Sequence, residues 1–256
     1  MTPSRTDAGP GEAGGARTGL PRLSALEISR RRWSTILAGD WLGQQSFMTI
    51  PELLANCPVH QGETVLDLGC GDGSFVRNLA RESSATAYGF DPYGHFSVEA
   101  EYPAILFQGL IETALGDPRV RELDVDVLVS CDVMQYVSRP LDQLAGYLDH
   151  CHPRAMFCSL WHSTDPAVNE AWGFADPATE DQLRGFCAER GIACAVNQRF
   201  PGRINRQLQS LETYRDSLAE LWGGEALDRR RQLEEAAVAA VASGVLRQIC
   251  LSGSPA

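Results

Sequence analysis

A glycine-rich stretch directly after an apolar run restricts the fold of this chain more than any other feature. Thr64–Leu68 is short and apolar, with Asp67 near its end, and this pattern predicts a strand buried on both faces. Three glycines follow at alternate positions, and a helix with one apolar face comes next. Glycine accepts positive φ and lets a ligand approach the backbone, and the N–H groups of a helix start face whatever binds there. The order of strand, glycine turn and helix therefore predicts a ligand site.

The spacing of the glycines argues against a dinucleotide. The dinucleotide pattern is G-x-G-x-x-G, whereas Gly69, Gly71 and Gly73 form G-x-G-x-G. An acid precedes the first glycine, which suits a ligand end that carries an ammonium group. The stretch E-x-x-L-D-x-G-C-G-x-G resembles the first motif of class I S-adenosylmethionine (SAM) methyltransferases. This resemblance implies SAM as the cofactor, with its methionine part held by Asp67 and the turn, Cys70 included. The alternative is a tight turn without a ligand.

Further apolar runs alternate with helical patterns, which predicts an α/β fold with a mostly parallel sheet. The other expected strands are 85–90, 104–108, 125–130, 156–160, 192–198 and 245–252. The resemblance, which runs from about residue 50 to residue 251, implies a Rossmann-like, doubly wound sheet of seven strands with the last strand antiparallel. We expect residues 245–252 to form an edge strand.

Other cofactor contacts are expected at the ends of the next strands. Asp91 follows the second strand, where a carboxylate accepts hydrogen bonds from a ribose diol, although an Asp-Pro turn is the alternative. Members of the family often have an aspartate for the adenine amino group where Leu110 stands here. Adenine would instead contact backbone and apolar side chains. The remaining expected cofactor contacts are Pro92, Leu110, Ile111 and Cys131.

Three residues at strand ends are candidates for acceptor chemistry. Asp132 and Tyr136 follow the fourth strand, and His162 ends the fifth, where ligands of open α/β sheets bind. Family members that act on small molecules often carry histidine where Tyr136 stands. A core aromatic at Tyr136 and a structural histidine at His162 are the alternatives. No metal site is expected, since His150, Cys151 and His152 are adjacent and no second ligand pair lies at metal spacing.

The flanking segments suggest a lid on a single domain. Residues 1–20 are rich in glycine, alanine and proline and predict a disordered tail. Residues 21–256 are expected to form one methyltransferase-like domain. Helices within residues 21–57 and a helical insertion at residues 202–243 would roof the acceptor site, as in small-molecule methyltransferases.

Composition excludes several function classes. The formal net charge of −11 disfavours nucleic acid as the main substrate, because binding phosphates needs clustered cations. The chain has no lysine, which excludes a lysine Schiff base. Eight cysteines without C-x-x-C, and no secretory signal, predict a reduced, cytoplasmic protein. No apolar run is long enough to cross a membrane. A homodimer or a partner subunit stays open.

The leading hypothesis is methyl transfer from SAM to an oxygen or nitrogen of a small molecule, in secondary metabolism. One alternative is an enzyme of the same fold that does not use SAM and closes a ring by intramolecular displacement, which Leu110 motivates. Another is a partner-dependent subunit without catalysis.

Overall fold

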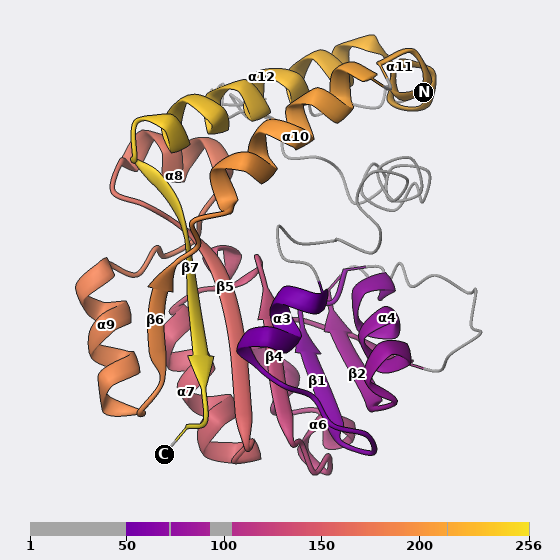
Figure 1. The fold of residues 1–256 in the computed structure, drawn as a ribbon, viewed down its shortest axis with the longest axis vertical. Coiled ribbons are helices and arrows are strands. Elements are labelled where there is room, and N and C mark those ends of the chain that lie inside the picture. The colour runs from indigo at the N-terminus through magenta and orange to yellow at the C-terminus, as the bar shows by residue number, and fades with distance from the viewer. Residues whose placement is uncertain (1–49, 72, 93–103, 214, 256) are drawn as a thin grey trace, which may run out of the picture.

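The computed structural model describes residues 50–71, 73–92, 104–213 and 215–255, which are built around one sheet of seven strands (Figure 1). The strands lie in the order β3-β2-β1-β4-β5-β7-β6. Strands β1 to β5 pair in parallel, and β7 is antiparallel to both of its neighbours. Their bounds are β1 Thr64–Leu68, β2 Thr86–Asp91, β3 Ala104–Gln108, β4 Val127–Cys131, β5 Ala155–Ser163, β6 Ala193–Val196 and β7 Leu246–Gly253.

The predicted sheet class is confirmed, but the predicted place of the last strand is wrong. Strand β7 lies between β5 and β6 rather than at the edge, and the edge strand is β6. The two strands differ in burial. Ile249 and Leu251 of β7 are fully buried, whereas β6 is short and alternates between exposed and half-buried residues, as an edge strand does.

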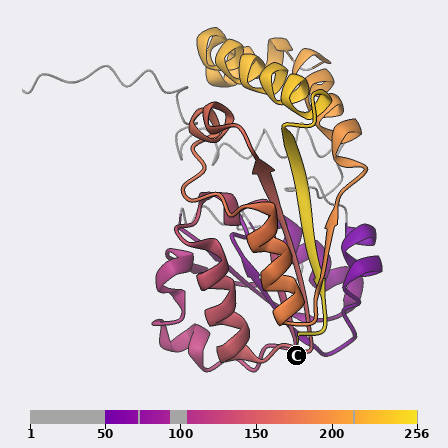
Figure 2. The ribbon, with the colours of Figure 1, turned by 90° about the vertical axis from the view of Figure 1, so that its left-hand side faces the viewer.

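Helices cover both faces of the sheet, as Figure 2 shows. On one face, α3 and α4 pack against β1, β4 and β5; on the other, α5, α7 and α9 form a second cluster with the same sheet. The helices are α3 Ile50–Asn56, α4 Ser74–Ser83, α5 Ile111–Ala114, α6 Pro118–Arg121, α7 Pro140–Cys151, α8 Pro166–Trp172, α9 Glu180–Glu189, α10 Phe200–Thr213, α11 Arg215–Trp222 and α12 Gly224–Ala242, with a 3-10 turn η1 at Met134–Tyr136.

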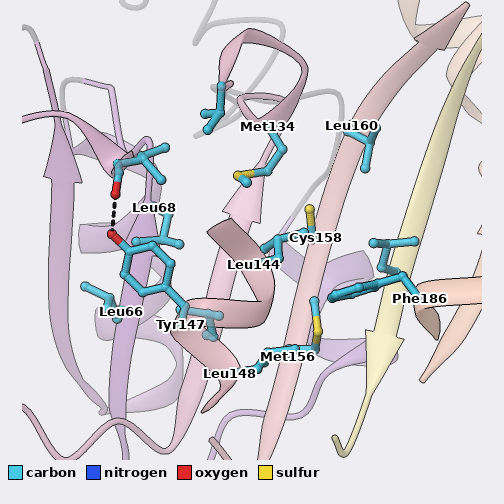
Figure 3. Close-up of a cluster of buried hydrophobic side chains, with 14 of the residues drawn as sticks. Leu66, Leu68, Met134, Leu144, Tyr147, Leu148, Met156, Cys158, Leu160 and Phe186 are labelled. Atoms are coloured by element: carbon cyan, nitrogen blue, oxygen red, sulfur yellow. Dashed lines mark hydrogen bonds between the residues drawn. The ribbon is translucent and has the colours of Figure 1, made fainter. Parts of the chain in front are cut away.

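The larger core cluster reaches the segment that follows β3. Leu66, Leu68, Met156 and Cys158 of the strands meet side chains of α7 and α9 (Figure 3). Within this cluster the hydroxyl of Tyr147 in α7 donates a hydrogen bond to the carbonyl of Ile111 at 2.8 Å. The core therefore anchors the start of α5, immediately after Leu110.

The predicted helical insertion is present as α10, α11 and α12, which we call the helical layer. It lies beyond the carboxyl ends of the parallel strands, and α12 leads into β7 (Figure 1). Helices α10 and α12 pack against each other. Of the N-terminal segment, α3 is described, whereas the predicted tail and the rest of residues 1–49 lie outside the described residues. Within those bounds, no helix is apolar and long enough to span a bilayer.

Candidate active site

The glycine turn between β1 and α4 needs glycine for reasons internal to the chain. Gly69 and Gly73 both have φ of 82°, and Gly71 has φ of 59°, a region that side chains disfavour. A Cβ on Gly69 would lie 2.5 Å from a methyl of Val133, and one on Gly73 would lie 2.5 Å from a methyl of Leu106. At these two positions the absence of a side chain leaves room for Val133 and Leu106. The sequence alone does not reveal this packing requirement.

Asp91 is bound to the glycine turn. The N–H of Gly71 donates to Asp91 Oδ2 at 3.0 Å, and the N–H groups of Gly69 and Cys70 donate to the carbonyl of Phe90 at 2.7 and 3.2 Å. Asp91 ends β2 and is buried. Two residues predicted to contact the cofactor, Gly71 and Asp91, are thus brought together.

Asp67 is a buried carboxyl group in β1, with one oxygen unsatisfied. Its exposed fraction is 2%, and Oδ1 has no hydrogen-bond partner in the described part of the chain. Burial, followed by the nearby charge of Asp91, raises the pKa of Asp67 to about 8. A cationic group would supply both the missing donor and the missing counter-charge.

The position expected to meet adenine is apolar. Leu110 stands before α5 with 54% of its surface exposed, whereas the next residue, Ile111, is buried. The carbonyl of Pro92 accepts a hydrogen bond from Gln108 at 3.3 Å, which links the ends of β2 and β3. Leu110 can offer a base apolar contact but no side-chain hydrogen bond.

Asp132 is held rigidly at the end of β4. It follows Cys131 with φ of 56°, which is uncommon for a residue with a side chain. Its Oδ1 accepts hydrogen bonds from Ser159 Oγ at 2.9 Å and from Gln248 Nε2 at 2.6 Å. Sequence reasoning missed Ser159 and Gln248, although each is a polar residue inside an otherwise apolar run.

The loop after Asp132 is fixed by a buried amide. Gln135 donates from Nε2 to the carbonyl of Asp132 at 2.8 Å, and its Oε1 accepts from the N–H of Trp161 at 3.4 Å. Next to it, Tyr136 is 46% exposed, and its ring meets Phe174 edge to face with centroids 5.8 Å apart. Desolvation raises the pKa of the Tyr136 hydroxyl, which therefore stays protonated near neutral pH. Tyr136 is thus a donor at the strand ends.

His162 lies apart from the side chain of Asp132. Successive residues of a strand point to opposite faces, and Leu160 of β5 packs among α7 and α9, whereas Trp161 packs against α10. His162 shares the face of Leu160, while Ser159, the partner of Asp132, points to the other. The Nδ1 atom of His162 lies 3.1 Å from the carbonyl oxygen of Ala178, and burial lowers the pKa of the imidazole. This contact gives the ring a structural use, and its catalytic role stays a prediction.

A family model described as a methyltransferase domain matches residues 44–199, more than half of the chain. The chain belongs to the class I SAM-dependent methyltransferases. It is thus an enzyme of the class I methyltransferase type. No curated protein matches it.

Solved structures of methyltransferases share the fold at low identity. The Mycobacterium tuberculosis cyclopropane synthase MmaA2 aligns with a TM-score of 0.63 and 14% identity, over 79% of this chain and 81% of that chain. A phosphoethanolamine N-methyltransferase of Haemonchus contortus aligns with a TM-score of 0.68 and 15% identity, over 91% of this chain and 60% of that chain. A SAM-dependent methyltransferase of Thiobacillus denitrificans, in complex with S-adenosylhomocysteine, aligns with a TM-score of 0.59 and 15% identity. The alignment covers 87% of this chain and 97% of that chain.

In this methyltransferase the helical layer is tied to the rest of the domain by an ion-pair cluster. Glu52 of α3 accepts from Arg199, which directly precedes α10, at 2.7 Å and also pairs with Arg203 of α10. Arg203 is 3% exposed, so Glu52 supplies the counter-charge for a buried guanidinium group. In the residues that the structure describes, no group of three histidine, cysteine or acidic side chains is arranged to hold a metal ion.

Proposed function

We propose that this methyltransferase transfers the methyl group of SAM to an oxygen or nitrogen atom of a small molecule. One observation carries the proposal: the glycine turn and Asp91 are hydrogen-bonded to each other at the carboxyl ends of β1 and β2, close to the buried carboxyl group of Asp67. The buried, unsatisfied oxygen of Asp67 fits the ammonium group of the cofactor, and Asp91 fits a ribose diol. When bound, SAM supplies a methyl carbon activated by a sulfonium.

The residues of the chain would bind and orient the two reactants. Asp67 accepts the ammonium donors, and Gly71 holds the Asp91 carboxylate in place by donating to Oδ2. On the acceptor side, the protonated Tyr136 hydroxyl can donate to the acceptor, and the fixed backbone at Asp132 and Gln135 sets its position. Displacement at a methyl group requires alignment and exclusion of water more than proton transfer. The helical layer beyond the strand ends supports that role.

The charge of the chain and its cysteines bear on the kind of acceptor and on the compartment. The net charge of −11 supports a small acceptor rather than a phosphate polymer. The cysteines form no disulfide in the part of the chain that the structure describes, which fits a reducing cytoplasm. Natural-product biosynthesis is the proposed context, and a homodimer or a partner subunit is compatible with it.

A second candidate is favoured by Leu110. Because this exposed residue offers no hydrogen bond to an adenine amino group, the same fold could instead align a nucleophile and a leaving group within one substrate and close a ring without SAM. The two candidates differ in whether the protein binds the cofactor.

Calorimetric titration of the full chain with SAM and with S-adenosylhomocysteine separates them. We expect binding in the micromolar range, a free energy of about −8 kcal/mol, for at least one of the two. Asp91→Ala should weaken this binding at least about a hundredfold. Asp124→Ala, which removes an exposed carboxylate before β4, is the matched control and should bind as the wild type does. No binding by the folded wild-type protein would contradict the proposal and favour the SAM-independent enzyme or the partner-dependent subunit.

A further inference from the structure

The inner side of the helical layer carries a buried polar pair. Gln207 of α10 is 5% exposed and Glu234 of α12 is 0% exposed. Gln207 Nε2 donates to Glu234 Oε1 at 2.9 Å, and Arg230 forms an ion pair with the same oxygen. Two packed helices are usually joined by apolar side chains, so a buried carboxylate and amide between them need a reason.

The pair leaves two acceptor oxygens unsatisfied. Neither Glu234 Oε2 nor Gln207 Oε1 has a hydrogen-bond partner among the described residues. A buried acceptor without a donor has lost its hydrogen bonds to water and gained none in return, which lowers the stability of the folded protein. Two buried donors of the described residues are also unpaired, Arg230 Nε and, one turn before Gln207 in α10, Arg203 Nη1, but neither makes a hydrogen bond to an open acceptor. A group with several N–H donors would satisfy both acceptor oxygens.

The helices that carry this cluster reach the aromatic residues near the strand ends, because Ile204 of α10 and Ala237 of α12 pack in one apolar cluster with Phe174. The charges of Arg230 and Glu234 also act on the Tyr136 hydroxyl, together with that of Asp132. Tyr136 is exposed over 46% of its surface and contacts the ring of Phe174. The polar pair of the helical layer and the aromatic residues at the strand ends therefore border the same region of the proposed acceptor site.

We propose that Gln207 and Glu234 bind an amine of the acceptor, whose apolar part contacts Tyr136 and Phe174. An ammonium group has three N–H donors and can satisfy both open oxygens at once, whereas a hydroxyl has one and a carboxylate has none. An aromatic ring of the same region, such as that of Tyr136 or Phe174, would add attraction for a cation bound over its face. This inference rests on the proposed function and adds to it the chemical class of the acceptor: a small, partly apolar amine.

The test is calorimetric titration of the full chain, saturated with S-adenosylhomocysteine, with three probes that share a phenyl ring. They are 2-phenylethylamine, 2-phenylethanol and 3-phenylpropanoate, which carry a cation, a neutral hydroxyl and an anion. We expect the amine to bind at least about tenfold more tightly than either of the others, a difference of about 1.4 kcal/mol. Equal affinities, tighter binding of the alcohol or the acid, or no amine binding would overturn the inference.

Matched variants locate the effect. Glu234→Gln and Gln207→Met should each weaken amine binding at least about tenfold and leave the affinity for S-adenosylhomocysteine unchanged. Glu235→Gln removes the same charge from the neighbouring, exposed position and should change neither affinity. If Glu234→Gln fails to fold, Gln207→Met decides, because it leaves the ion pair of Arg230 with Glu234 intact. Wild-type amine affinity in a folded variant of either residue would refute the site.

The same experiment separates the two proposals. If the wild type fails to bind S-adenosylhomocysteine, the proposed function fails. If it binds S-adenosylhomocysteine but does not prefer the amine, only the inference about the acceptor fails.

Discussion

The backbone N–H of Gly71 donates to Asp91 Oδ2 at 3.0 Å, so the glycine turn after β1 and the acid at the end of β2 are one structural unit. Parallel pairing of β1 with β2 places Leu68 beside Phe90 and thereby brings the residues after each strand together. The acid expected to bind a ribose therefore also shapes the turn expected to bind the methionine part.

The double use of Asp91 leads to a graded prediction. Asp91→Asn keeps an acceptor for the Gly71 N–H but loses the charge, and we expect it to weaken S-adenosylhomocysteine binding by about tenfold. Asp91→Ala loses both and should bind at least about a hundredfold more weakly than the wild type. Titration calorimetry measures both affinities. Equal losses in the two variants would show that the bond to Gly71 adds nothing to binding.

The raised pKa of Asp67 predicts that cofactor affinity depends on pH. In the free protein the carboxyl group is neutral below its pKa of about 8, and binding an ammonium group requires the carboxylate. Affinity for S-adenosylhomocysteine should therefore rise as pH increases from about 6 to about 8, with release of a proton on binding. Asp67→Asn should remove this rise; a variant that keeps it would assign the proton to another group.

Asp67 should also lower the stability of the free protein. Its pKa is higher folded than unfolded, so the folded state binds more protons and the free energy of unfolding falls as pH rises from about 4 to about 8. Asp67→Asn should raise the free energy of unfolding at about pH 8 by about 1 kcal/mol or more, because it removes an unpaired buried charge. Urea denaturation measures this difference. A less stable variant would mean that the carboxylate has a partner in the folded protein.

Gly69 should tolerate no side chain, for two separable reasons. Gly69→Ala places a Cβ 2.5 Å from Val133 and imposes a side chain on a φ of 82°. We expect a loss of about 2–4 kcal/mol in the free energy of unfolding, measured by urea denaturation. Adding Val133→Ala removes the two clashing methyl groups but leaves the Cβ of residue 133 at 2.7 Å, so it should recover only part of the loss due to the clash and none of the part due to φ. A double variant no more stable than Gly69→Ala would show that the two methyl groups contribute nothing to the loss.

His162 is the residue at which the structural and catalytic interpretations diverge. His162→Asn puts an amide donor near the place of Nδ1, so it can preserve the contact with the Ala178 carbonyl. If the ring is structural, this variant keeps turnover within about threefold, and His162→Ala lowers the free energy of unfolding by about 1–2 kcal/mol. Turnover assays and urea denaturation measure the two effects. A large loss of turnover in His162→Asn at unchanged stability would restore the catalytic prediction.

Local sequence patterns predict much of the fold. The apolar runs, the glycine spacing and the acids after β1 and β2 each depend on a few neighbouring residues, and they predicted the sheet class and the cofactor side of the site. The position of β7 was not predictable in this way. Whether a strand of apolar residues such as Ile249 lies at an edge or between two neighbours depends on which strands pair, and chain order does not contain that information.

Side-chain networks between distant elements were also beyond the sequence. Ser159 and Gln248 hold Asp132 from two other strands, and Gln207 meets Glu234 from two helices separated by α11. Each of these residues looks unremarkable in its own segment. A hydrogen bond over such separations exists because the fold brings the partners within about 3 Å, a distance that local spacing does not determine.

The sequence by itself determined the strand–glycine turn–helix unit, the acids at Asp67 and Asp91, and the absence of lysine chemistry, because backbone preference and residue chemistry are local properties. The tertiary structure decided that Gly71 is bound to Asp91, that His162 faces away from the partner of Asp132, and that two acceptor oxygens are buried in the helical layer. These relationships follow from strand pairing and helix packing, which set distances and burial between residues far apart in the chain.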